Sequence, residues 1–195
     1  DGLFSTIAVV DGQAVLLRYH WQRLLLGCQR LGLSTQRFSE WQQQLAMFMR
    51  CYPHHTVKII ISRGIGGRGY WPDPEQAPRC YLLAWPKSTH EPRWQHGIHT
   101  VTLQGQLGLN PRLAGLKHLN RLEQVLLRQE LATTGCPEAI VCDLQGRVVE
   151  GVFSNLFWWY QGQLFTPQLE QAGVAGVMRA WLLEYQQQQG QEVQQ

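Results

Sequence analysis

The amino-acid sequence predicts an α+β fold made of two lobes. Segments with β-strand composition are joined by short turns that contain glycine, as in antiparallel hairpins. In four other segments, apolar residues recur at helical spacing. Residues 86–93 resemble a linker, so we expect a smaller N-terminal lobe over residues 1–88 and a C-terminal lobe over residues 89–195.

The expected elements of the first lobe begin with a hairpin. Its strands cover residues 4–10 and 14–17, with Asp11-Gly12 as the turn. A helix from His20 is expected to stop at Gly32, because glycine favours helix termination. The remaining elements, in order, are a second helix over residues 38–48, a buried strand over 57–62, an irregular stretch over 64–79 and a strand over 80–85.

The second lobe is expected to open with a short strand near residues 99–103. A loop over residues 105–115 leads to a helix over 118–131 that Thr134-Gly135 ends. Two hairpins follow, with strands at residues 139–142 and 148–150 and then at 156–160 and 164–166. A last helix begins near Gly176 and is followed by a glutamine-rich, low-complexity tail.

Composition and charge exclude several classes of protein. The 195 residues are 44% hydrophobic and 16% charged, as in globular proteins. The formal charge of +3 is spread without a basic run, so we expect no nucleic-acid partner. The five cysteines form no Cys-x-x-Cys pair, which favours reduced thiols in the cytoplasm over disulfides or a metal site. No apolar run approaches the roughly 18 residues of a membrane span.

The stretch from Gly64 to Gly69 formally matches the dinucleotide fingerprint G-x-G-x-x-G. That fingerprint must open a helix, and the following Tyr-Trp-Pro-Asp-Pro cannot start one directly. A tight structural loop is therefore the favoured interpretation. A substrate loop in which Arg63 or Arg68 faces an anion is a further alternative.

Lys117 is a candidate nucleophilic amine. It lies where the loop is expected to enter a helix, and the positive end of a helix lowers the pKa of a nearby amine. A lysine needs such a lowered pKa to act as a nucleophile. From spacing alone, a solvated lysine in the first helical turn is the commoner situation.

Two other segments complete a possible cofactor site. Glu150 ends a strand and provides a carboxylate beside an apolar sheet. Residues 173–178 form a glycine-containing turn before the last helix, whose free N–H groups could bind a phosphate. A lysine for an aldehyde, a carboxylate for a pyridine nitrogen and a helix N-terminus for a phosphate are the groups that pyridoxal 5'-phosphate requires.

Three segments resemble the aminodeoxychorismate lyases. They are the run Gly-Leu-Lys-His-Leu-Asn-Arg-Leu-Glu-Gln at residues 115–124, the loop at residues 62–70, and Glu150 followed by Ser-Asn-Leu-Phe at residues 154–157. These lyases belong to the fold-type IV pyridoxal-phosphate enzymes, the class IV aminotransferase family, with the branched-chain and D-amino-acid aminotransferases. The resemblance covers essentially the whole chain and implies the two-lobed fold of that group.

The resemblance also implies roles for individual residues. Lys117 would hold the cofactor covalently and then act as the catalytic base, and Glu150 would keep the pyridine nitrogen protonated. Arg23 would bind the phosphate. Residues at matching positions that would also contact the cofactor are the backbone N–H groups of Val177 and Met178 and the side chain of Ser154.

The implied activity is the conversion of 4-amino-4-deoxychorismate to 4-aminobenzoate and pyruvate, as in folate biosynthesis. The same fold also serves branched-chain and D-amino-acid transaminases, and an inactive, shortened relative is a third alternative. Members of the group are usually homodimers that act on small molecules, so the resemblance implies a homodimer. The chain begins at Asp1 without methionine and lacks terminal segments of the family, so we expect that sequence is missing at one or both ends.

Overall fold

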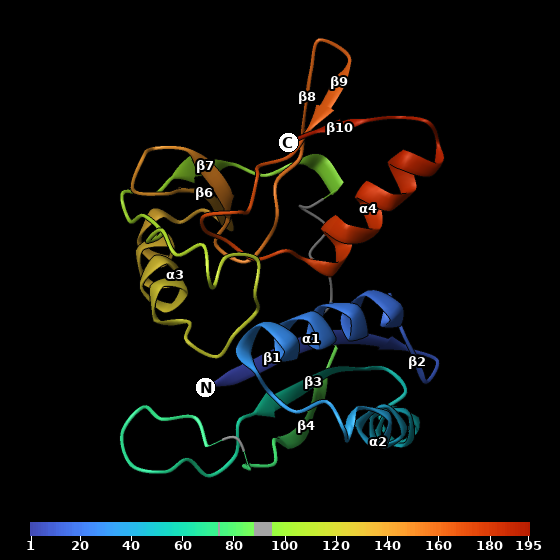
Figure 1. The fold of residues 1–195 in the computed structure, drawn as a ribbon. Coiled ribbons are helices and arrows are strands. Elements are labelled where there is room, and N and C mark those ends of the chain that lie inside the picture. The colour runs from blue at the N-terminus through green and yellow to red at the C-terminus, as the bar shows by residue number, and fades with distance from the viewer. Residues whose placement is uncertain (74, 88–94) are drawn as a thin grey trace. The chain divides into compact units, whose positions relative to one another are not determined.

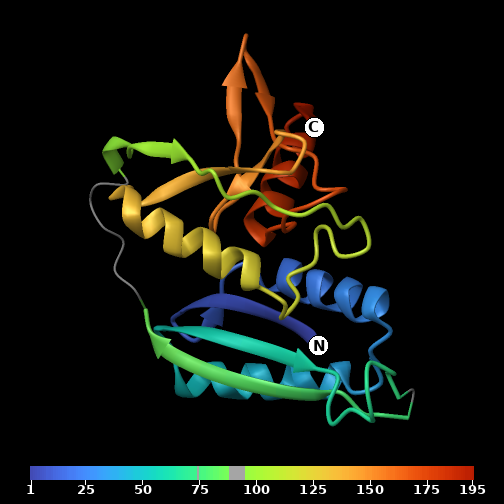
Figure 2. The same ribbon diagram turned by 90° about the vertical axis from the view of Figure 1, so that its left-hand side faces the viewer.

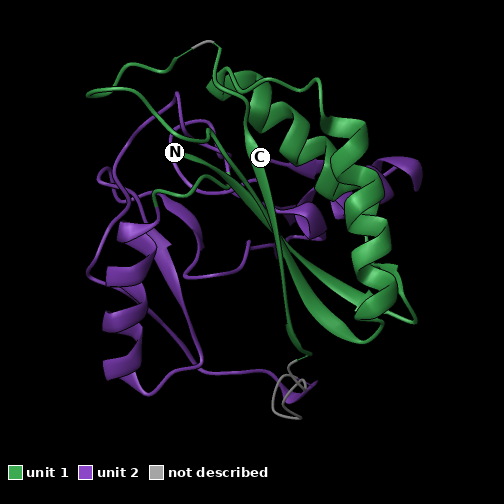
Figure 3. Ribbon diagram, turned by 90° about the horizontal axis from the view of Figure 1, so that it is seen from below, with its two compact units in different colours: residues 1–89, 117–120 green, residues 90–116, 121–195 purple. Residues whose placement is uncertain are grey.

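The computed structural model describes residues 1–73, 75–87 and 95–195. The chain divides into two compact units (Figure 3). Unit 1 contains residues 1–89 together with residues 117–120, and unit 2 contains residues 90–116 and 121–195. Most of the expected linker over residues 86–93, and the expected boundary between residues 88 and 89, lie outside the described residues.

Unit 1 is built on a four-stranded antiparallel sheet in the order β2-β1-β3-β4 (Figure 1). The bounds are β1 Gly2–Val10, β2 Gln13–Ala14, β3 His55–Ser62 and β4 Arg79–Pro86. Asp11 and Gly12 have φ values of 51° and 75°, as a tight hairpin turn requires, and the predicted hairpin is confirmed. The strand predicted over residues 14–17 is shorter than expected, because a helix already begins at Leu17.

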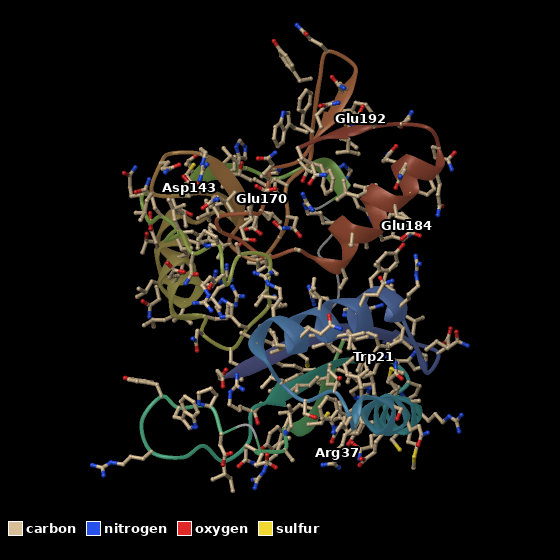
Figure 4. All side chains as sticks on the ribbon, in the orientation of Figure 1. Trp21, Arg37, Asp143, Glu170, Glu184 and Glu192 are labelled. Carbon is tan, nitrogen blue, oxygen red and sulfur yellow. The ribbon has the colours of Figure 1, made fainter. Side chains whose placement is uncertain are left out.

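Two helices, α1 Leu17–Leu31 and α2 Phe38–Cys51, pack on one face of this sheet. Alternate strand residues point at the helices, so β3 has one buried face instead of the full burial that its apolar run suggested. Gly32 ends α1 with φ 62°, as predicted. Trp21 of α1, labelled in Figure 4, packs edge-to-face on Phe38 at 5.2 Å between ring centroids. The buried core contains Leu3, Ile7, Val9, Leu24, Cys28, Leu33, Trp41, Leu45, Met49, Val57, Ile59 and Ile61.

Unit 2 contains a three-stranded sheet in the order β5-β6-β7 and the helix α3 (Figure 2). The bounds are β5 Thr100–Thr102, β6 Glu138–Cys142, β7 Val148–Gly151 and α3 Leu122–Thr134. β6 and β7 pair antiparallel, which confirms the first hairpin predicted for this half of the chain. Its core contains Leu103, Leu107, Leu127, Leu131, Ala139, Val141, Val149, Val152 and Ala172.

The second sheet of unit 2 has the order β10-β9-β8, with β8 Trp158–Tyr160, β9 Gln163–Phe165 and β10 Val193–Gln194. The predicted turn at Gln161-Gly162 is confirmed, with φ values of 49° and 76°. The last helix, α4 Val177–Gln188, begins where Gly176 predicted. β10 was not expected, because it lies in the glutamine-rich tail, and its parallel pairing with β9 is invisible to local composition. Within the described residues, none of the helices is long and apolar enough to cross a membrane.

Candidate active site

In unit 1, Arg23 is anchored to the buried face of β1. One of its terminal nitrogens donates to Ser5 Oγ at 2.7 Å, and Ser5 Oγ lies 2.7 Å from His20 Nδ1. Ser5 is fully buried and His20 is 4% exposed. His20 and Arg23 are three residues apart on α1, so they lie on one helix face and meet the same hydroxyl.

His20 is held as a neutral ring. Burial is the main cause that lowers its pKa from the usual 6.5 to about 4, and the charge of Arg23 lowers it further. A hydrogen bond with the backbone of Val15 partly opposes this shift. Because Ser5 Oγ accepts from Arg23, its own hydrogen is available to His20 Nδ1. One terminal nitrogen of the Arg23 guanidinium is therefore held by an uncharged pair, Ser5 and His20.

Lys117 is joined to β1 through the backbone. Phe4 N–H donates to the Lys117 carbonyl at 3.0 Å, and Leu119 N–H donates to the Gly2 carbonyl at 2.9 Å. The Lys117 ammonium lies over the Phe4 ring, 4.8 Å from its centroid. These contacts lie within unit 1 and give the amine a defined backbone and an aromatic neighbour.

The predicted start of the helix near residue 118 is wrong, because α3 begins at Leu122. Residues 117–119 use their backbone groups to pair with β1, and groups paired in that way cannot also make helical hydrogen bonds. The field of a helix end falls off within the first turn. Lys117 therefore does not lie at a helix N-terminus, contrary to the sequence prediction.

Arg63 and Arg68 are the two candidates for binding a substrate anion, and they differ in their contacts and in their exposure. Arg63 makes a bidentate ion pair with Asp1, at 2.8 and 2.7 Å. It also donates to the carbonyls of Leu31 and Gly32, at the C-terminus of α1. Arg68 is exposed in the stretch after Gly64, where the described residues form no helix, contrary to the dinucleotide fingerprint. Arg63 thus serves the structure of unit 1, and Arg68 is the more accessible cation.

In unit 2, Glu150 lies on β7 and is 5% exposed. Its Oε2 accepts the backbone N–H of Val174 at 2.8 Å. The close approach requires glycine at 173, where φ is 84° and an added Cβ would lie 2.6 Å from Val149 Cγ1. Gly115 pairs with the same segment through hydrogen bonds to the Gly173 carbonyl and from Ala175 N–H. Backbone contacts therefore fix the buried carboxylate.

Ser154 directs its hydroxyl to another buried carboxylate. It donates to Glu138 Oε2 at 2.8 Å, and Glu138 Oε1 accepts the backbone N–H groups of Ala139 and Val152 at 3.0 and 2.9 Å. Glu138 is 5% exposed, and these bonds satisfy its charge. A hydroxyl that donates in this way keeps its lone pairs for a further hydrogen bond.

Asn155 binds the backbone just before the N-terminus of α4. Its Oδ1 accepts the Gly176 N–H at 3.0 Å, and its Nδ2 donates to the Val174 carbonyl at 2.8 Å. Gly176, the N-cap residue, has no side chain that could cap the N–H groups of the first turn. The backbone N–H groups of Val177 and Met178 are in the first turn, where helix geometry provides no internal acceptor. This is a suitable place for an anion.

Arg121 is a possible site residue that the sequence patterns did not single out. It donates to the Leu116 carbonyl, and that carbonyl belongs to the peptide that continues to Lys117. Burial lowers the pKa of the Arg121 guanidinium, and the negative charges of Glu150 and Glu123 oppose that shift. In the sequence, Arg121 is marked only by its place in the motif at residues 115–124, and the structure shows that it is partly buried.

The groups present fit pyridoxal 5'-phosphate by chemistry. Unit 1 provides the primary amine of Lys117 and the anchored guanidinium of Arg23. Unit 2 provides the buried carboxylate of Glu150 and the uncapped N-terminus of α4. An aldehyde, a protonated ring nitrogen and a phosphate call for these donors and acceptors.

Comparisons with known proteins agree with this chemistry. The family model for amino-transferase class IV matches residues 2–195. The aminodeoxychorismate lyase of Vibrio harveyi is 37% identical over 198 residues, which cover 100% of this chain and 72% of that protein. The 4-amino-4-deoxychorismate lyase structure from Pseudomonas aeruginosa has 44% identity and a TM-score of 0.94, covering 99% of this chain and 72% of its own.

A fold IV transaminase from Curtobacterium pusillum is more distant, with 25% identity and a TM-score of 0.80 over 100% of this chain and 67% of its own. The predicted α+β, fold-type IV architecture is therefore confirmed. With a family match over residues 2–195, the chain belongs to the class IV aminotransferases.

Proposed function

We propose that this chain is a pyridoxal-phosphate-dependent lyase that converts 4-amino-4-deoxychorismate to 4-aminobenzoate and pyruvate. The observation that carries the proposal is its likeness, at 37% and 44% identity, to two aminodeoxychorismate lyases over 99–100% of the chain. When bound, the cofactor supplies an electron sink for negative charge that develops on the substrate. The remaining chemistry belongs to the protein.

Lys117 has the central role in this proposal. Its amine would hold the cofactor until the substrate 4-amino group takes its place, and the freed amine would then take the proton from substrate C4. Cleavage of the bond between the ring and the enolpyruvyl oxygen would give an aromatic product, and the released enolpyruvyl group would gain a proton to become pyruvate. The Phe4 ring beside its ammonium and the pairing of its backbone with β1 support a fixed amine position. A fixed position is what a general base needs.

Other residues hold the cofactor in the proposed enzyme. Glu150 accepts a hydrogen bond from the protonated ring nitrogen, and its own hydrogen bond from Val174 supports this orientation. Arg23 and the first-turn N–H groups of Val177 and Met178 bind the phosphate, and Ser154 offers a lone pair. Arg68 is the better candidate for a substrate carboxylate, since the fork of Arg63 is engaged by Asp1.

The test is covalent labelling followed by an assay of the products. Treatment with pyridoxal phosphate and borohydride should leave a stable adduct on Lys117, located by mass mapping. Lys117→Ala should lose the adduct and reduce turnover by at least about 10⁴-fold, because both covalent binding and proton transfer depend on the amine. Lys87→Ala, an exposed lysine after β4, is the matched control.

Product analysis separates the lyase from a transaminase, the alternative that the Curtobacterium relative supports. A lyase releases pyruvate without any amino acceptor, whereas a transaminase requires one in stoichiometric amount. Turnover that depends on an acceptor would contradict the proposed reaction. Failure to bind the cofactor at all would favour an inactive relative.

We further propose that the enzyme is a cytoplasmic homodimer. Unpaired cysteines support a reducing compartment, since all five have free thiols. Exposed apolar side chains on α3 support association, with Leu122 70%, Val125 49% and Leu126 57% exposed. Sedimentation velocity should give twice the mass of the 195-residue chain. A single monomer species at micromolar concentration would refute the dimer.

A further inference from the structure

The open face of the sheet in unit 1 carries a second lysine beside Lys117. β1 and β3 pair antiparallel with Phe4 opposite Ile60 and Thr6 opposite Lys58. Residues directly opposite one another project to the same face. The core is formed by the alternate residues Leu3, Ile7, Val57, Ile59 and Ile61, so Phe4 and Lys58 project away from it.

Both ammonium groups contact the same aromatic ring. Lys58 Nζ is 4.5 Å from the Phe4 centroid and Lys117 Nζ is 4.8 Å from it. The two nitrogens are therefore separated by no more than the sum of these distances. Lys58 comes from β3, and Lys117 is held on β1 by its backbone, so two independent elements bring the charges together.

This arrangement accumulates positive charge. At the upper limit of about 9 Å, two like charges repel by about 0.5 kcal/mol in water and by about 2 kcal/mol near a protein surface, and the repulsion grows as the separation shortens. The Phe4 ring attracts each cation by about 0.5–2 kcal/mol, more as the site is more fully desolvated. In the described part of unit 1, no carboxylate lies within 4 Å of the Lys58 ammonium. An anion beside Lys58 would relieve the repulsion.

We propose that Lys58 is the specificity-determining residue that binds the ring carboxylate of the substrate. The inference rests on the proposed function, in which the substrate presents its 4-amino group at Lys117. An amine and a carboxylate at opposite ends of one six-membered ring can address two lysines that share one phenyl contact. Lysine suits this role as a compact point charge.

The test compares an acid with its uncharged amide. Binding of 4-aminobenzoate and of 4-aminobenzamide to the cofactor-loaded enzyme is measured by calorimetry for wild type, Lys58→Met, Lys58→Arg and Lys87→Met. Wild type should prefer the acid by at least tenfold. Lys58→Met should reduce that preference to less than about twofold, while Lys58→Arg and Lys87→Met retain it.

Steady-state kinetics give a second readout. Lys58→Met should raise KM for the substrate at least tenfold with a smaller change in kcat, because the carboxylate is bound equally in the ground and transition states. The borohydride adduct on Lys117 should form as in wild type. An acid preference that survives in Lys58→Met, or is absent in wild type, overturns the role of Lys58 alone. Absence of the Lys117 adduct in wild type overturns the proposed function itself.

Discussion

At the scale of single residues, His20 shows how burial sets a charge state. The ring is 4% exposed, and its neighbours are a hydroxyl and a guanidinium instead of a carboxylate. Protonation would place a second positive charge beside Arg23. The folded state therefore contains the neutral ring, and protonation of His20 in acid should destabilise that state.

We expect stability to depend on pH through His20. Its folded pKa of about 4 is below the usual 6.5, so the unfolded chain binds the proton more tightly. The stabilisation is fully present above pH 6.5 and is lost as pH falls toward 4. Between pH 7 and pH 5 the free energy of unfolding should fall by about 2 kcal/mol, as measured by urea titration.

The control for His20 is a variant that cannot titrate. His20→Gln keeps a hydrogen-bonding side chain, and its unfolding free energy should be lower at pH 7 but nearly flat between pH 7 and pH 5. His99→Gln, on an exposed residue before β5, should retain the wild-type slope. Equal slopes for wild type and His20→Gln would refute the assignment.

At the scale of elements, sequence reasoning succeeded where local signals decide the structure. The turns at Asp11-Gly12 and Gln161-Gly162 adopt positive φ at both residues, which glycine-containing pairs favour. It failed at residues 117–119, where pairing with β1 overrides the apolar periodicity that predicted a helix. β10 was not predicted because the glutamine-rich tail has no strand-like composition and its partner, β9, is distant in sequence.

Asn155 should couple the start of α4 to phosphate binding. Asn155→Ala removes the hydrogen bonds to the Gly176 N–H and the Val174 carbonyl, so the free energy of unfolding should fall by about 1–3 kcal/mol. The loosened N-terminus should also bind pyridoxal phosphate less tightly, by about tenfold. Affinity for pyridoxal, which lacks the phosphate, should change little.

Comparing the affinities for pyridoxal phosphate and pyridoxal separates phosphate binding at the N-terminus of α4 from a general effect on folding. Asn110→Ala, an exposed asparagine in the same unit, is the matched control and should leave both affinities unchanged. Equal losses for pyridoxal phosphate and pyridoxal in Asn155→Ala would mean that Asn155 only supports folding. This prediction depends on the structure, because Asn155 and Gly176 are 21 residues apart in the chain and their hydrogen bond cannot be read from the sequence.

At the scale of the whole molecule, chain order and spatial grouping differ. Residues 117–120 belong to unit 1, although the flanking chain on both sides belongs to unit 2. The composition of residues 117–120 does not indicate that they belong to unit 1, because their place there depends on backbone pairing with Gly2 and Phe4. The candidate lysine could be identified from its motif, but the aromatic ring and the second lysine beside it required the structure.

The stability of the whole chain should rise with cofactor concentration. A ligand at 100 times its Kd adds about 2.7 kcal/mol to the folded state, which for a chain of this length corresponds to about 5–11 °C in melting midpoint. Scanning fluorimetry of dialysed protein should show a shift that grows with pyridoxal phosphate and is smaller with pyridoxal. In Lys117→Ala, only the part of the midpoint shift that comes from the phosphate contacts should remain. A midpoint that does not move with the cofactor would contradict specific binding, since mass action requires any ligand of the folded chain to stabilise it.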